Sequence, residues 1–163
     1  MKNKWAIVLG CSTGHGAAIS KQLASEGYGI IGFHFDRGSV KKEAQQLENE
    51  ISLMNNGKTK FWNENAADKK TIEKRLVEIK SLIKDGYVKL LMHSIAFGST
   101  TNFFEPTPVK QRQMDMTQHV MANCLIYWAQ ALLNESLLDD GSRILGITSE
   151  GSYKAMDGYG PVG

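Results

Sequence analysis

The residues best suited to chemistry lie near the start of the chain, in the run Gly10-Cys11-Ser12-Thr13-Gly14-His15-Gly16. An apolar run over residues 5–9 precedes it, and a helical pattern follows from Ala17. Glycines let a turn bend sharply, and the N–H groups at a helix N-terminus favour an anion such as a pyrophosphate. The alternative is that these glycines only permit a tight turn. The candidate phosphate-binding residues are Gly10, Ser12, Thr13, Gly14, His15 and Gly16.

An acidic residue follows the glycines at an informative distance. Asp36 comes twenty residues after Gly16 and closes a second apolar run, residues 29–35. In dinucleotide-binding folds a carboxylate at the tip of the second strand accepts from the adenosine ribose. The spacing Gly-x-x-x-Gly-x-Gly differs from the commoner Gly-x-Gly-x-x-Gly, so the strand, helix and acid around it carry the argument. Together they predict a strand-turn-helix-strand unit that binds a dinucleotide.

Composition agrees with an enzyme-sized globular domain. The chain has 163 residues, 42% of them hydrophobic, with 19 basic and 17 acidic side chains. This balance gives little support to nucleic-acid binding, and no segment has the eighteen or so apolar residues of a membrane span. Cys11 and Cys124 have no metal-ligand spacing, so we expect no metal site and a reducing cytoplasm. We expect a single domain over residues 1–163.

The remaining pattern alternates helices and strands. We expect a helix capped by Ser39, a strand at residues 60–63, a helix capped by Asp68 and a buried strand at residues 88–94. We then expect one long helix over residues 109–133. After a break at Gly141, we expect a strand at residues 143–147. Alternating strands and helices predict an α/β fold with a doubly wound parallel sheet, a Rossmann-type three-layer sandwich.

Several of these motifs fall where the short-chain dehydrogenase/reductase family carries its own. They are the glycine turn, Asp36, the Asn65-Ala66-Ala67-Asp68 turn, and Ser149 before Tyr159. The chain therefore resembles that family over nearly all its length. It is similar more narrowly to the enoyl-acyl-carrier-protein reductase branch, because the fourth strand ends in His93-Ser94-Ile95-Ala96-Phe97 and not in Asn-Asn-Ala-Gly.

Two departures from the ordinary family pattern bear on activity. Met121 stands where ordinary members have a catalytic asparagine, which the enoyl reductases also lack. The lysine that accompanies the tyrosine is absent, because position 163 is Gly and the enoyl-reductase spacing would put the lysine three residues further on. From the resemblance we expect a truncated chain, incomplete at the C-terminus and inactive on its own.

The resemblance also implies roles for individual residues. Reduction by a nicotinamide needs an acid or oxyanion stabiliser at the substrate oxygen, and Tyr159 is the candidate, with Tyr153 as its rival. Ser149 matches the substrate-oriented hydroxyl; the alternative is a serine that caps its own turn. Cofactor contacts are expected after the third and fourth strands, where an open sheet binds ligands. These residues are Asn65, Ala66, Ser94, Ile95 and Ala96.

The leading hypothesis is an NAD(P)H-dependent reductase of 2-enoyl thioesters in fatty-acid biosynthesis. The alternatives are a ketone/alcohol short-chain dehydrogenase and a non-catalytic nucleotide-binding module. Asp36 favours NADH, because it would repel the 2′-phosphate of NADPH, although the adjacent Arg37 has the charge to pair with that phosphate. We expect a small-molecule or carrier-bound acyl substrate. We also expect a homo-oligomer, since the apolar stripe of the long helix is wider than one sheet face needs.

Overall fold

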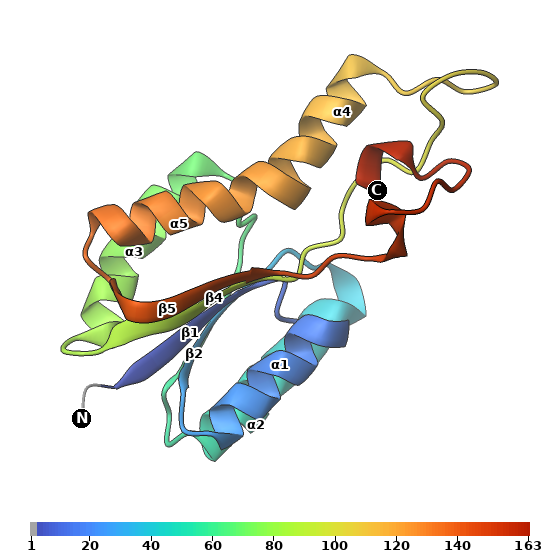
Figure 1. The fold of residues 1–163 in the computed structure, drawn as a ribbon. Helices are drawn as coiled ribbons and strands as arrows, with labels where there is room; N and C mark the ends of the chain where they lie inside the picture. Colours follow the sequence, from blue (N-terminus) through green and yellow to red (C-terminus); the bar gives the residue numbers. More distant parts are fainter. Residues whose placement is uncertain (1–2) are drawn as a thin grey trace.

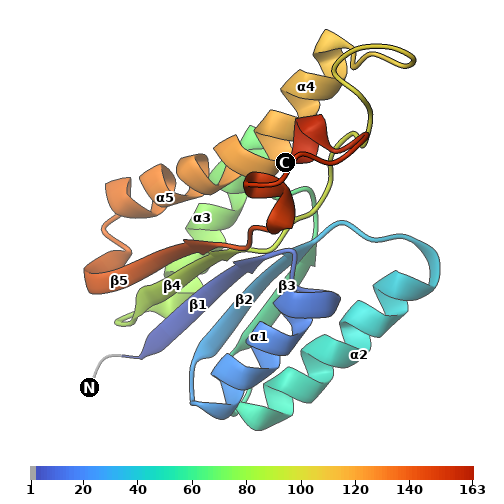
Figure 2. The same ribbon diagram turned by 45° about the vertical axis from the view of Figure 1, so that its right-hand side comes forward.

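The protein is built on one sheet of five parallel strands in the order β3-β2-β1-β4-β5, in a computed structural model that describes residues 3–163. The strands are β1 (Lys4–Leu9), β2 (Gly29–His34), β3 (Thr59–Asn63), β4 (Tyr87–His93) and β5 (Leu138–Gly146). The helices are α1 (Gly14–Ser25), α2 (Gly38–Met54), α3 (Lys69–Ile83), α4 (Gln111–Gln118) and α5 (Cys124–Asn134). Figures 1 and 2 show α1 and α2 on one face and α3 and α5 on the other. The predicted three-layer α/β fold is confirmed.

Strand β1 lies at the centre of the sheet and packs on both faces. Ile7 and Leu9 join the core beneath α3 and α5, whereas Ala6 and Val8 join the core beneath α1 and α2. All four side chains are completely buried. A strand buried on both faces needs an unbroken apolar run, which is why this segment shows no alternation with polar residues. The run thereby fixes the strand from which the glycine turn emerges.

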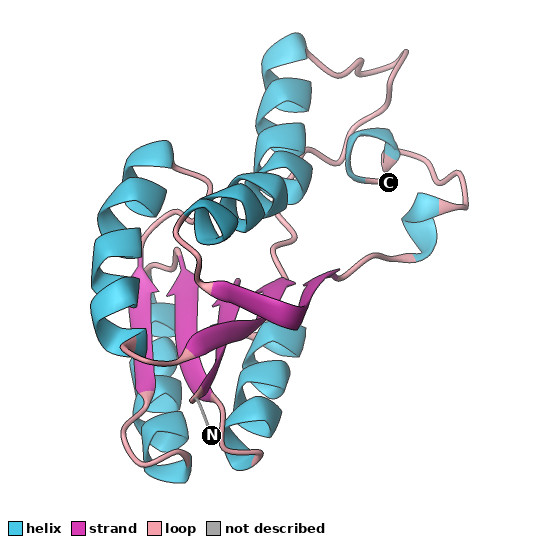
Figure 3. Cartoon of the chain, turned by 60° about the vertical axis from the view of Figure 1, so that its left-hand side comes forward, coloured by secondary structure: helices cyan, strands magenta, loops and turns pink. Residues whose placement is uncertain are grey.

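The long helix is continuous but irregular. It begins at Gln111, two residues later than predicted, and ends at Asn134. Between α4 and α5 it passes through a π-helical turn, η1 (His119–Asn123), and Figure 3 shows the axis bending there. Met121 lies in this turn. No helix within residues 3–163 has the length and apolar character needed to cross a membrane.

Two predicted helix starts need correction. Helix α1 begins at Gly14, three residues before the apolar pattern starts at Ala17. Ser39 is not a cap: Arg37 is the N-cap of α2, and Ser39 lies inside the helix. Gly38, with φ +60°, is the first residue of the helix, which therefore begins two residues earlier than a Ser39 cap would allow.

The prediction for the fifth strand was wrong at its start. Strand β5 begins at Leu138 and runs through Gly141, which we had expected to break the chain. The partners of Val88 and Leu90 in β4 are Leu138 and Arg143, so β5 bulges between them. The hydroxyl of Ser142 donates to the Val88 carbonyl at 2.7 Å and holds the bulge. The glycine, with φ +79°, permits this bulge without ending the strand.

Candidate functional site

A cleft of about 300 Å³ opens at the carboxyl ends of β1, β2 and β4. The chain winds from β1 outward to β3 and then returns to β4 on the other side of β1. Ligands bind in open α/β sheets at such a reversal point. Nine of the predicted cofactor-binding residues line the cleft: Gly10, Ser12, Thr13, Asp36, Asn65, Ala66, Ser94, Ile95 and Ala96. Gly14, His15, Gly16 and Arg37 do not line it.

The glycine turn is fixed by close backbone contacts. Gly10 has φ +85°, and a Cβ there would lie 2.4 Å from the Ser94 carbonyl oxygen. Gly16 lies in the first turn of α1, and a Cβ there would lie 1.8 Å from the Gly10 carbonyl oxygen. The absence of both side chains lets β1, α1 and the loop after β4 meet. Thr13, the N-cap of α1, lines the cleft, so the N-terminus of the helix lies beside it. The first N–H groups of a helix have no partners within the helix and favour an anion such as a pyrophosphate.

Asp36 is held on three sides at the rim of the cleft. The backbone N–H of Asp36 donates to Asn63 Oδ1 at 2.8 Å, and Asn63 Nδ2 donates to the Asp36 carbonyl at 3.0 Å. The Asp36 carboxylate Oδ2 lies 2.9 Å from Nδ1 of His34. The side chain of Asp36 is 23% exposed and that of His34 is 6% exposed. Asp36 is therefore a fixed acceptor at the predicted ribose position.

The turn after β3 is anchored to the long helix. Asn65 Oδ1 accepts from the Ala67 N–H at 3.0 Å and shapes the turn. The indole Nε1–H of buried Trp128 donates to the Ala66 carbonyl at 2.8 Å. Helix α5 thus fixes the orientation of the cleft-lining peptide at Ala66.

The loop after β4 is anchored in a similar way. The Ser94 N–H donates to the Leu9 carbonyl at 2.7 Å, which extends the pairing of β4 with β1. His93 is buried, and its Nε2 lies 3.0 Å from the carbonyl oxygen of Val120 in the π-helical turn. Burial lowers the pKa of His93, so the neutral form is favoured. These contacts give His93 a structural role, in which it ties the end of β4 to the π-helical turn.

The sequence did not reveal several of the side chains in the cleft. The missed residues are Phe33, His34, Phe35, Glu64, Phe97 and Val120. Glu64 accepts from Arg75 through both carboxylate oxygens, and the Arg75 Nε contact is 2.7 Å. The hydrogen bond from Arg75 lowers the pKa of Glu64 to about 2. Residues 33–35 could have been predicted to line the cleft, because they end the apolar run that leads to Asp36.

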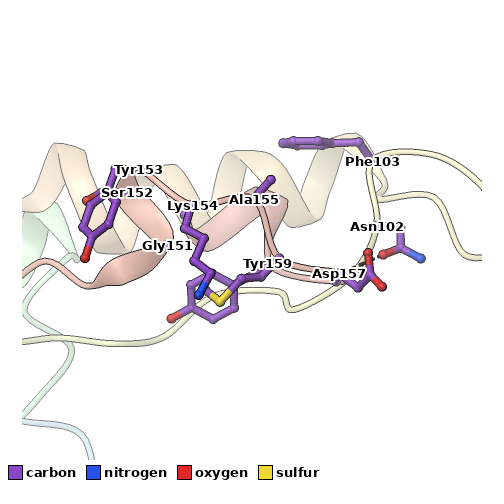
Figure 4. Close-up of a pocket in the computed structure, with 13 residues that line it drawn as sticks. Asn102, Phe103, Gly151, Ser152, Tyr153, Lys154, Ala155, Asp157 and Tyr159 are labelled. Atoms are coloured by element: carbon purple, nitrogen blue, oxygen red, sulfur yellow. Dashed lines mark hydrogen bonds between the residues drawn. The ribbon is translucent and has the colours of Figure 1, made fainter.

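The predicted catalytic residues lie elsewhere. Tyr159 lines a second pocket of about 490 Å³, shown in Figure 4, where it lies between Tyr153 at one end and Phe103 at the other. Its ring packs against Gly151, where a Cβ would come within 2.3 Å. Ser149 does not line this pocket, and its Oγ accepts from the Gly151 N–H at 3.2 Å. This bond is the turn-capping alternative that the sequence had left open.

The structure does not bring Tyr159 into the cofactor cleft. Among residues 3–163 no residue lines both cavities. Their linings are joined by a contact: Phe97 lines the cleft, and a Cβ at the next residue, Gly98, would lie 2.5 Å from Val162 Cγ1, next to Gly163 in the lining of the Tyr159 pocket. The described residues 3–163 contain no cluster of three or more His, Cys, Asp or Glu that could hold a metal ion.

Comparisons with known proteins agree with this geometry. A family model described as "Enoyl-(Acyl carrier protein) reductase" matches residues 10–163. A short-chain dehydrogenase/reductase from Serratia marcescens superposes with a TM-score of 0.82 at 21% identity, over 98% of this chain and 61% of that one. A 3-oxoacyl-[acyl-carrier protein] reductase from Brucella melitensis gives 0.72 at 18% identity, over 96% and 61%.

An L-sorbose reductase from Gluconobacter frateurii, solved with NADPH and L-sorbose, gives a TM-score of 0.68 at 16% identity, over 82% of this chain and 48% of that one. At these identities the likeness concerns the fold. The chain spans 61% of the Serratia protein's length.

Proposed function

Because the chain belongs to the short-chain dehydrogenase/reductase family, we propose that it forms the cofactor-binding part of an NAD(P)H-dependent oxidoreductase that reduces the double bond of a 2-enoyl thioester. The observation that carries the cofactor assignment is the packing of Gly10 and Gly16, where side chains have no room. This packing leaves backbone N–H groups to face a pyrophosphate. The Gluconobacter relative was solved with NADPH, which supports a nicotinamide dinucleotide.

The enoyl-thioester assignment is supported by three observations. The family model that matches residues 10–163 is described by that activity. The segment from His93 to Phe97 resembles the enoyl-reductase form, and Ser94, Ile95 and Ala96 of this segment line the cleft. Met121, in the π-helical turn, replaces the asparagine of ordinary family members.

We assign the following roles to the residues in this reaction. A bound NADH or NADPH supplies the hydride. The turn from Gly10 to Gly16 holds the pyrophosphate, and Asp36 accepts from the adenosine ribose. Tyr159 donates a hydrogen bond to the thioester oxygen as negative charge develops there. The substrate would then have to lie between the cleft and the Tyr159 pocket, which approach each other near Phe97 and Gly98.

The test is a substrate panel followed at the absorbance of the reduced nicotinamide. Crotonyl thioesters of coenzyme A and of an acyl carrier protein are compared with 3-oxoacyl thioesters and simple ketones, each with NADH and NADPH. With the complete gene product we expect turnover of the enoyl thioesters, whereas we expect none with residues 1–163 alone. Preference for the ketones would replace this proposal with the alcohol/ketone alternative, an activity that the Brucella relative's description supports. Cofactor binding without turnover would indicate a nucleotide-binding module.

The role of Tyr159 is tested in the same assay. Replacing Tyr159 by Phe removes only the hydroxyl, so we expect turnover to fall by about 100-fold while cofactor affinity changes little. Tyr153→Phe is the matched control, since Tyr153 lines the same pocket and is 82% exposed. Equal losses in the two variants, or none in Tyr159→Phe, would remove Tyr159 from the mechanism.

A further inference from the structure

Asp36 has little freedom to move its backbone. Asn63, the last residue of β3, accepts from the Asp36 N–H and donates to the Asp36 carbonyl through one side-chain amide. Asn63 is also the register partner of His34 in the pairing of β3 with β2. The peptide groups on both sides of Asp36 are therefore fixed to the sheet. What remains free is rotation of the carboxylate about its side-chain bonds.

The His34 imidazole removes that remaining freedom. His34 is the last residue of β2, its ring is buried, and Nδ1 lies 2.9 Å from Asp36 Oδ2. An ionised carboxylate only accepts hydrogen bonds, so Nδ1 must carry the hydrogen and donate it. A buried ring has few rotamers available, and so it holds the carboxylate in one orientation. Both residues line the cofactor cleft.

We propose that His34 is a positioning residue that orients the Asp36 carboxylate toward the adenosine ribose, and that it thereby sets a preference for NADH over NADPH. The inference rests on the proposed function, since it needs the cleft to bind a nicotinamide dinucleotide. His34 engages one acceptor site of Oδ2, so Oδ1 keeps all of its acceptor sites for a ribose hydroxyl. A carboxylate fixed at this place disfavours a 2′-phosphate, whereas a mobile carboxylate can turn away from it.

The experiment compares two substitutions of nearly the same shape. His34→Asn keeps an amide N–H close to the position of Nδ1, and His34→Leu replaces that amide by methyl groups. Dissociation constants for NADH and NADPH are measured by fluorescence titration of the protein. We expect His34→Leu to weaken NADH binding about fivefold and to leave NADPH binding unchanged or tighter, while His34→Asn stays close to the wild type.

A double-mutant cycle with Asp36→Ala separates positioning from a general structural effect. If His34 acts through Asp36, His34→Leu changes NADH affinity less than about twofold once Asp36 is Ala. His34→Gln, whose amide lies one bond further from the backbone, serves as the donor-displaced variant if His34→Leu does not fold.

Three results would overturn the inference. They are equal weakening of NADH and NADPH, an undiminished effect of His34→Leu in the Asp36→Ala protein, and a loss in His34→Asn as large as in His34→Leu. A wild-type protein that binds neither cofactor would instead refute the proposed function, and this inference with it.

Discussion

Replacing Gly16 by Ala should damage both stability and cofactor binding, although alanine is the better helix former. The new Cβ would lie 1.8 Å from the Gly10 carbonyl oxygen, whereas ordinary contact begins at 3.4 Å. The gap of about 1.6 Å must be opened between two backbone segments, because the obstacle is not a side chain that can rotate. Overpacking lowers the free energy of unfolding by about 3 kcal/mol, and the higher helix propensity of alanine raises it by about 1 kcal/mol. We therefore expect a net decrease of about 2 kcal/mol.

Gly16→Ala should also weaken cofactor binding, including in the molecules that stay folded. Moving the start of α1 away from the Gly10 turn misaligns the backbone donors that face the pyrophosphate. Losing one such charge-assisted hydrogen bond lowers affinity by about tenfold or more. Urea unfolding measures the free energy of unfolding, and fluorescence titration with NADH and NADPH measures affinity.

Gly14→Ala is the matched control for this variant. Gly14 lies two residues away in the same helix, and a Cβ there would meet nothing within 4 Å. Its φ of +53° is the only obstacle, which costs about 1 kcal/mol. Cofactor affinity in this control should stay within about threefold of the wild type. If Gly16→Ala bound cofactor and unfolded like Gly14→Ala, the backbone contact would not support the site as argued.

Two further predictions concern the Glu64–Arg75 pair and the exposed face of α5. The Arg75 hydrogen bond lowers the pKa of Glu64 from 4.5 to about 2, so this pair stabilises the fold above pH 4.5 and loses that effect as the pH falls through about 2. Relative to Glu64→Gln, the wild type should lose about 2 kcal/mol of unfolding free energy over that range, as urea titrations at several pH values would measure, and parallel profiles would contradict it. We also propose that α5 forms an interface between copies of the protein, because Ile126 and Leu133 are 54% and 66% exposed. Ile126→Glu should then convert oligomer to monomer in sedimentation, and a monomeric wild type at micromolar concentration would contradict this.

The sequence was most informative where burial alone decides structure. Residues 5–9 form an apolar run because strand β1 is covered on both faces, and such a run can be recognised without knowing which elements pack against it. Gly141 shows the opposite case. A glycine in the sequence is equally consistent with the end of a strand and with a β-bulge inside one. Here the bulge is held by the hydrogen bond from Ser142 to Val88, two residues that are 54 apart in the sequence.

The candidate site divides in the same way. The glycine turn and Asp36 follow from local spacing, and both line the cleft. The contact between His34 and Asp36 had a local signal in the sequence, because the apolar run over residues 29–35 predicts an extended chain up to Asp36, and side chains two apart in an extended chain lie on one side. The Glu64–Arg75 pair joins residues 11 apart across a turn, which no periodicity encodes. Whether Tyr159 acts on substrate stays a prediction.

The close approach of Gly10 and Gly16 also bears on how this site tolerates sequence change. The two segments fit together because neither position carries a side chain, so the requirement at both positions is that every residue larger than glycine is excluded. Thr13 and His15 of the turn are exposed and carry no such constraint, whereas Cys11 is buried and Gly14 has φ +53°. In a saturation library we expect Gly10 and Gly16 to tolerate the fewest substitutions in the turn, and the exposed positions Thr13 and His15 to tolerate the most.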